Sequence, residues 1–202
     1  MFGLFKKSEK DEAPFTIYYH GACKEFTGRA APIMMILDHA GIKYDIKDVS
    51  DAPDNCGFAV PFISFEDGQN LSQTIAITTD LGEKYGLIGK TGKEKTECLQ
   101  AQLDLNDAFC ECIAGKFKEN PERLLKWKGV IESRLKDPFF GGKEVSAADY
   151  FAVMVFTFIN HHFGENYDDF PKIAKWLTSI DEVPVVKKQK ESGIEIIPEF
   201  MK

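Results

Sequence analysis

Residues 60–77, VPFISFEDGQNLSQTIAI, form the stretch that decides the fold of this chain. Two short runs within it, 62–65 and 70–72, favour strands, and the turn residues EDGQ separate them. A helix is expected at 73–85, where Gly86 follows as the residue that ends it. The stretch therefore predicts a β-hairpin that leads directly into a helix.

Upstream of this stretch, the chain alternates between strand and helix patterns. Residues 15–19 read FTIYY, a β-branched and aromatic run typical of a strand. Apolar residues recur at helical spacing over 29–40 before Gly41, and 43–48 alternates as a second strand. The order strand, helix, strand, hairpin, helix predicts a small mixed sheet covered by helices.

Helical patterning dominates the rest of the chain. We expect a first domain at 15–86, an all-helical domain at 91–202 and a flexible leader at 1–14. Proline stands in the first turn of three of the expected helices, where its missing N–H costs nothing. These helices are predicted at 93–117, 121–135, 147–161, 171–179 and 184–191.

Composition excludes several classes of protein. The 202 residues carry 25 Lys and Arg against 32 Asp and Glu, a net charge of −7 that disfavours nucleic acid as a partner. The longest apolar run, Tyr150 to Ile159, has about half of the roughly 20 residues that a membrane span needs. The amino-terminal sequence does not fit a secretory signal. Five cysteines without a framework spacing suit a reducing compartment, so we expect a cytoplasmic protein.

Three short motifs can be interpreted in more than one way. Pro61 either begins an edge strand or carries a cis peptide bond. Gln73 and Thr74 open a helix, whose free N–H groups attract a carboxylate, although a plain capping segment would look the same. Ser146 and Asp149 form a capping box in front of an apolar helix, which indicates a structural role.

In this order and at these separations, the motifs resemble the cytosolic glutathione transferase family, in its tyrosine-type, sigma- or alpha-like form. The resemblance covers about Phe15 to Ser192. It implies a thioredoxin-like α/β domain that binds glutathione and an all-α helical bundle, and the usual assembly is a homodimer. The motifs that carry it are GRAAPI at 28–33, Pro61, Gln73-Thr74, Ser146 to Asp149, and Phe170-Pro171-Lys172 with Trp176-Leu177.

The resemblance also implies roles for individual residues. Val60, before Pro61, would offer its backbone N–H and C=O to the cysteinyl part of glutathione. Gln73 and Thr74 would hold the γ-glutamyl carboxylate. Lys47 is the nearest substitute for residues that many relatives use at the glycine end. Glu111, or less favourably Asp107, falls where related proteins place an acid that reaches the glutathione amine of the neighbouring subunit.

Transferase chemistry needs a thiolate, because a free thiol with a pKa near 8.5 is mostly protonated at neutral pH. Tyr18 matches the family's catalytic tyrosine, which would donate a hydrogen bond to the glutathione sulfur. Strand alternation lets only one of Tyr18 and Tyr19 face the site. The loop from His20 to Gly28 is longer than in tyrosine-type relatives and contains Cys23 and Thr27. Either could take the place held by the Cys or Ser of other classes, so Cys23 ranks second and Thr27 third.

The resemblance implies an enzyme that joins the glutathione thiolate to small hydrophobic electrophiles, or uses glutathione to isomerise such compounds. Its role would be detoxification. No metal is expected. One alternative is a non-enzymatic binding or assembly module that keeps the fold. Another is a thiol transferase that depends on Cys23. The sequence does not identify the second substrate, because variable apolar positions shape that pocket.

Overall fold

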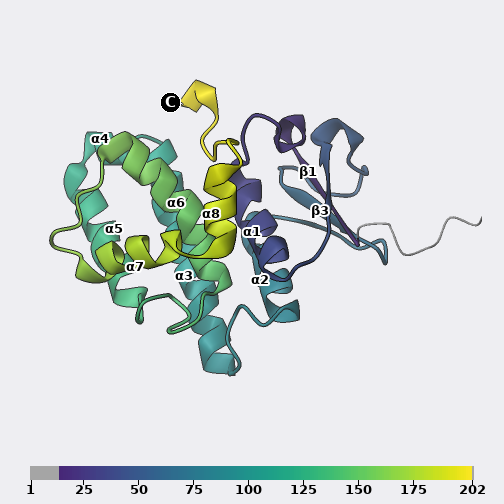
Figure 1. Cartoon of the computed structure of the whole chain (residues 1–202). Coiled ribbons are helices and arrows are strands. Elements are labelled where there is room, and N and C mark those ends of the chain that lie inside the picture. The colour runs from purple at the N-terminus through teal and green to yellow at the C-terminus, as the bar shows by residue number, and fades with distance from the viewer. Residues whose placement is uncertain (1–13, 202) are drawn as a thin grey trace, which may run out of the picture.

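The computed structural model describes residues 14–201, so all but the last residue of the predicted leader lies outside it. The amino-terminal part holds four strands: β1 (Phe15–Tyr19), β2 (Asp45–Asp48), β3 (Phe62–Phe65) and β4 (Asn70–Ser72). They form one mixed sheet in the order β2-β1-β3-β4 (Figure 1). β1 runs parallel to β2 and antiparallel to β3. The predicted hairpin and first strand are confirmed, whereas β2 begins two residues later than expected.

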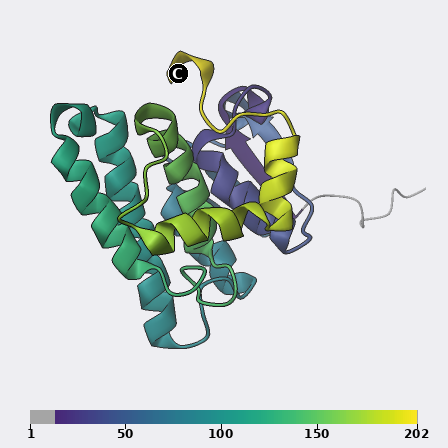
Figure 2. The same cartoon turned by 60° about the vertical axis from the view of Figure 1, so that its left-hand side comes forward.

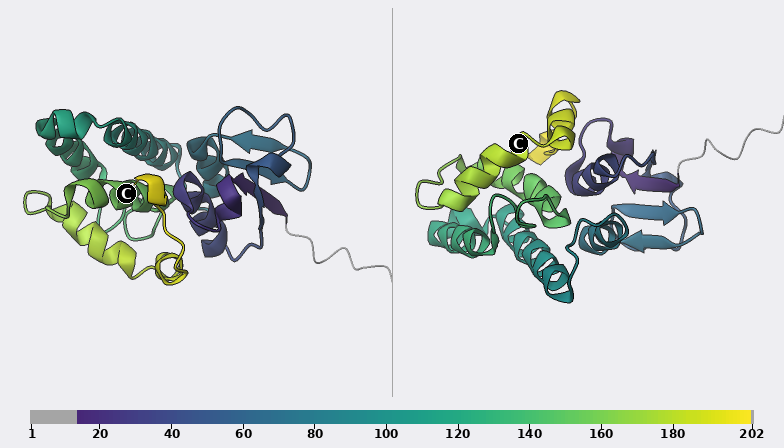
Figure 3. Two further views of the ribbon diagram at one scale, coloured as in Figure 1. Left: turned by 90° about the horizontal axis from the view of Figure 1, so that it is seen from above. Right: turned by 60° about the horizontal axis from the view of Figure 1, so that its bottom comes forward.

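Helices α1 (Ala31–His39) and α2 (Thr74–Lys84) lie between the sheet and the helical part of the chain (Figure 3). Ile17 and Ile63 face each other across β1 and β3 and are fully buried in the same core as apolar residues of both helices. A single 3-10 turn, Gly28–Ala30, leads into α1, so the helix starts later than predicted. One face of the sheet is thus closed by helices, and on the other face Tyr18 and Phe62 are covered by residues of the 49–60 segment.

The carboxy-terminal part is a helical bundle built around α6 (Ala147–Phe163), whose side chains are buried along most of its length (Figure 2). The helix predicted at 93–117 is wrong in one respect, because it is two helices. Gly115 adopts a left-handed conformation (φ 76°) that ends the first and starts the second. The remaining helices are α3 (Gly92–Ile113), α4 (Lys116–Glu119), α5 (Pro121–Arg134), α7 (Pro171–Asp181) and α8 (Pro184–Glu191).

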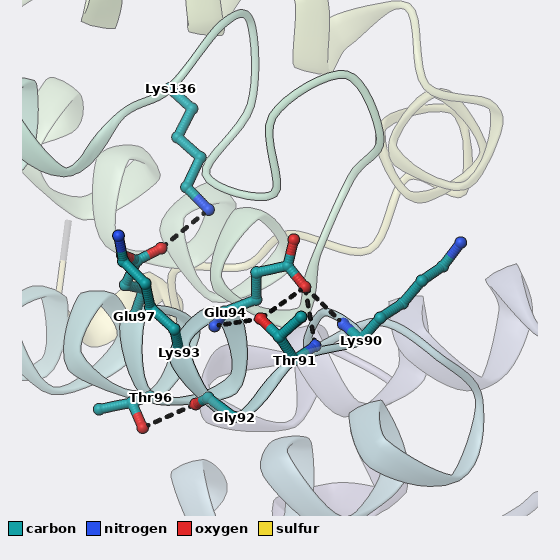
Figure 4. Close-up of polar contacts among 8 residues, drawn as sticks. All are labelled: Lys90, Thr91, Gly92, Lys93, Glu94, Thr96, Glu97 and Lys136. Carbon is teal, nitrogen blue, oxygen red and sulfur yellow. Dashed lines mark hydrogen bonds and ion pairs between the residues drawn. The ribbon is translucent and has the colours of Figure 1, made fainter.

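Two capping boxes fix the starts of α3 and α6. Thr91 and Glu94 exchange hydrogen bonds on the surface at the start of α3 (Figure 4). Ser146 and Asp149 do the same in the interior at the start of α6, which confirms the box predicted there. Both boxes satisfy N–H groups that the first turn of a helix leaves unpaired.

Side-chain hydrogen bonds join the two parts of the chain. Thr78 of α2 donates to Gln102 of α3 at 2.6 Å, and both side chains are buried. His39 of α1 lies 2.7 Å from the hydroxyl of Tyr150 on α6. These contacts fix the sheet against the bundle.

Among the described residues, no helix is long and apolar enough to cross a membrane.

Candidate functional site

The face of the sheet turned away from α1 and α2 carries a row of side chains that the strand register aligns. Tyr18 of β1 is paired with Lys47 of β2 and with Phe62 of β3, and Phe62 is paired with Ser72 of β4. Paired residues point to the same face, so these four side chains lie side by side. The row spans three strand spacings, roughly 14 Å, which exceeds the length of about 10 Å of an extended tripeptide.

Tyr18 lies in the middle of this row. Its ring is covered by Cys56, Phe62 and Val60, and the residue is 6% exposed. The hydroxyl makes no hydrogen bond to any described residue. Since every buried side-chain nitrogen or oxygen in the described part has a partner, this unpaired hydroxyl must touch solvent. Tyr18 therefore presents a free donor at the surface of the site.

Tyr19 points to the opposite face and is already engaged. Its hydroxyl accepts a hydrogen bond from the backbone N–H of Arg29 at 3.1 Å, and burial raises its pKa. The hydroxyl also lies against Gly28, where a β-carbon would come within 2.4 Å of it. Tyr19 thus fixes the chain in front of α1, which favours Tyr18 as the residue that faces a ligand.

Arg29 is a residue that the sequence reasoning did not single out. Its carbonyl accepts a hydrogen bond from the hydroxyl of Thr74 at 3.3 Å, so its backbone links β1 to α2. Its guanidinium lies 4.6 Å above the ring of Phe109 and donates to Asn106 on α3 at 3.2 Å. One feature of the sequence could have pointed to Arg29: it is the only charged side chain in the otherwise apolar segment GRAAPI.

The start of α2 has the features expected of an anion site. Gln73 is exposed, and its backbone adopts φ 70°, ψ 110°, a conformation that residues other than glycine rarely adopt. Thr74 is buried, and its hydroxyl is used by Arg29, so the backbone N–H groups of this first turn are what remains for a ligand. Gln73 directly follows Ser72, the end of the row that contains Tyr18.

Val60 precedes a cis peptide bond to Pro61, so the cis interpretation of that motif is confirmed. Val60 is half-buried and packs against the Tyr18 cluster. Within residues 14–201, neither its N–H nor its C=O makes a hydrogen bond. Backbone groups of this kind can pair with an extended peptide.

Cys23 and Thr27, the two alternatives to Tyr18, are both buried. Desolvation raises the pKa of the Cys23 thiol to about 12, which opposes formation of the thiolate that a nucleophile needs. The hydroxyl of Thr27 donates to the carbonyl of Glu195, 3.4 Å away in the carboxy-terminal segment. Both placements count against a direct role in the chemistry.

The two acids on α3 differ in their availability. Glu111 forms a bidentate ion pair with Arg123 of α5 in the same chain, and these hydrogen bonds lower the pKa of Glu111. Asp107 is exposed and has no partner among the described residues. Of these two acids, only Asp107 is therefore left without a partner among the described residues. Lys47 is likewise exposed and makes no ion pair within residues 14–201.

The architecture defines a class before any comparison: a thioredoxin-like sheet joined to a helical bundle. The model of the glutathione S-transferase C-terminal domain matches residues 104–193. A class-mu 26 kDa glutathione S-transferase of Fasciola hepatica is 24% identical over 188 residues, which cover 82% of this chain and 84% of that protein. Human glutathione S-transferase A3 is 27% identical over 190 residues, 82% of this chain and 85% of the human one.

Solved structures agree on the fold. A glutathione S-transferase of Caenorhabditis elegans superposes with a TM-score of 0.70 at 19% identity and covers 89% of this chain and 98% of its own. The family model and the relatives support membership of this chain in the glutathione transferase family, as the motifs led us to expect. Its fold is the one predicted, a thioredoxin-like domain followed by an all-α bundle.

Proposed function

We propose that this protein is a glutathione transferase that joins the thiolate of glutathione to small electrophilic, hydrophobic substrates. Its relatives carry that name, and no group of side chains suited to a metal ion was found among the described residues. Its described cysteines are all free thiols, which fits a reducing compartment such as the cytoplasm.

The observation that carries the proposal is the row of side chains that joins Lys47, Tyr18 and the start of α2, next to the free backbone groups of Val60. Glutathione would lie along it, with its cysteine at the free backbone groups of Val60 and its γ-glutamyl carboxylate at the start of α2. Lys47, at the opposite end, would take the glycine carboxylate. The strained backbone of Gln73 fits such a site, because strain of this kind concentrates where ligands bind.

Tyr18 would supply the chemistry at the centre of this row. Its hydroxyl would donate a hydrogen bond to the sulfur and favour the thiolate over the thiol, whose proton passes to solvent. The sulfur electron pair then forms a bond to an electrophilic carbon, and the leaving group departs with the electrons of the broken bond. The side chain is free to do this because no described residue uses its hydroxyl.

The two adjacent tyrosines provide a matched test. Tyr18→Phe should retain glutathione binding in calorimetry but lower kcat/KM toward an aryl halide about 10- to 100-fold, the value of one hydrogen bond to a charged group. Tyr19→Phe should mainly lower stability, by about 1 kcal/mol, because Arg29 loses its acceptor. Equal activity losses in the two variants would contradict the role of Tyr18. Binding without turnover in the unmodified chain would instead support a non-enzymatic binding module.

A homodimer is the second part of the proposal. Phe58, in the loop before Val60, is fully exposed, and Leu103 on α3 and Leu125 on α5 are about half exposed. Large apolar side chains on a surface mark places where another protein packs. Phe58→Ser should therefore shift the sedimentation of the protein from dimer to monomer, whereas a monomeric parent chain would refute this part.

A further inference from the structure

The segment that joins β2 to β3, residues 49–60, lies over the row of side chains proposed to hold glutathione (Figure 1). We call these residues the cover segment. Tyr18 and Phe62 are only 6% and 5% exposed, because four side chains of the cover segment pack against them. Tyr18 therefore has little room for the sulfur of a ligand while the segment stays in this position. The four side chains are those of Val49, Ala52, Cys56 and Val60.

The backbone of the cover segment also lies against the row, between Tyr18 and the start of α2. A β-carbon on Gly57 would lie 2.7 Å from the hydroxyl oxygen of Ser72 and 3.6 Å from the ring of Phe62. Gly57 has φ 129°, a value that other residues rarely adopt, so glycine allows this close approach. A tripeptide laid along the row would meet this backbone, so the segment must move before such a ligand fits.

Few polar contacts hold the cover segment to the sheet. The amide of Asn70 on β4 donates a hydrogen bond to the side-chain oxygen of Asn55 at 3.0 Å, on the surface. The side-chain oxygen of Asn70 accepts from Ser64 of β3, which is also hydrogen-bonded to Cys56. The backbone hydrogen bonds of residues 52–59 stay within the segment, and most of its residues are exposed. A segment with such contacts opens at a low cost in free energy.

We propose that the cover segment is a gate: it opens to admit glutathione to Tyr18 and covers the row in its absence. This inference rests on the glutathione site proposed above. Because the ligand binds only the open state, the apparent affinity is the intrinsic affinity reduced by the open fraction. Loosening the segment should therefore tighten glutathione binding, whereas loss of a residue that holds the ligand would weaken it.

Asn55→Ala tests the gate in the full chain. It removes the hydrogen bond from Asn70 and keeps the side chains that pack against Tyr18. One exposed hydrogen bond corresponds to about a fivefold change in the ratio of open to closed segment. Glutathione should therefore bind about fivefold more tightly in titration calorimetry. Gln69→Ala is the matched control and should leave the affinity unchanged, because this exposed amide of the same hairpin bonds through its side chain to no described residue.

Cys56 reports the opening directly, without any ligand. It is 4% exposed, so iodoacetamide reaches its thiol only when the cover segment lifts from the sheet. Mass spectrometry of the peptides should show that Cys56 is labelled about fivefold faster in Asn55→Ala. Cys98, which is buried on α3, serves as the internal control and should be labelled as slowly as in the parent chain.

The two measurements separate the gate from the glutathione site. Glutathione that binds Asn55→Ala with unchanged or weaker affinity, while Cys56 is labelled faster, would refute the gate alone. Unchanged labelling of Cys56 would also overturn it, because the segment would then not be held by this contact. If glutathione binds neither chain, the proposed function fails, and the gate fails with it even where the labelling of Cys56 accelerates.

Discussion

Asp149 is the side chain whose loss should affect the fold most. It is fully buried and accepts hydrogen bonds from the N–H and hydroxyl of Ser146 (both 2.7 Å), the N–H of Phe140 (2.9 Å) and the indole of Trp176 (2.9 Å). In Asp149→Ala the hydroxyl can rotate, but three N–H donors lose their acceptor. Each costs at least about 1 kcal/mol, and loss of the helix cap adds about 1 kcal/mol more. We therefore expect Asp149→Ala to lower the free energy of unfolding by about 4 kcal/mol.

The capping box of α3 is the matched control, because it has the same chemistry on the surface. Glu94 accepts its hydrogen bonds in solvent, so Glu94→Ala should cost no more than about 1 kcal/mol. Urea unfolding at pH 7, followed by circular dichroism, compares the two. If Asp149→Ala does not fold, Asp149→Asn, which keeps the side-chain volume and one acceptor oxygen but removes the oxygen that accepts from the N–H of Ser146, allows the same comparison with Glu94→Gln. Equal losses in the buried and exposed boxes would refute the claim that unsatisfied buried donors dominate the cost.

Three further predictions concern the site and its surroundings. Gln73→Gly should raise the free energy of unfolding by up to about 1 kcal/mol, because glycine adopts φ 70° without strain. The same change should weaken glutathione binding. A lower stability of the variant in thermal unfolding would contradict the first expectation. Iodoacetamide at pH 8 should modify the exposed Cys110 first, as mass spectrometry of the peptides would show, and early labelling of buried Cys23 would be inconsistent with the structure. The pKa of Cys23 is about 12 in the folded chain and near 8.5 in the unfolded chain. Its contribution to stability should therefore be complete below pH 8 and fall as pH rises from 9 to 12. If the urea midpoint of Cys23→Ala depends on pH as strongly as that of the unmodified protein, this prediction is wrong.

The local elements were predictable because their signals are local. The strand FTIYY, the hairpin after Pro61 and the capping box at Ser146 are each encoded within a few residues, and the structure places them where the sequence did. The break after Ile113 was missed, because a glycine in a polar, helix-compatible run does not reveal that it will adopt a left-handed conformation.

The order of motifs along the chain by itself indicated the family and predicted the fold, since strand and helix periodicity and caps depend on near neighbours. Only the tertiary structure decided which side chains are free to act. Strand pairing placed Tyr18 and Tyr19 on opposite faces of the sheet, with the hydroxyl of Tyr19 bonded to the backbone of Arg29, and the packing of distant segments buried Cys23. Helix packing paired Glu111 with Arg123, 12 positions away. Burial, solvent access and long-range partners arise from contacts between distant segments, so local patterns cannot specify them.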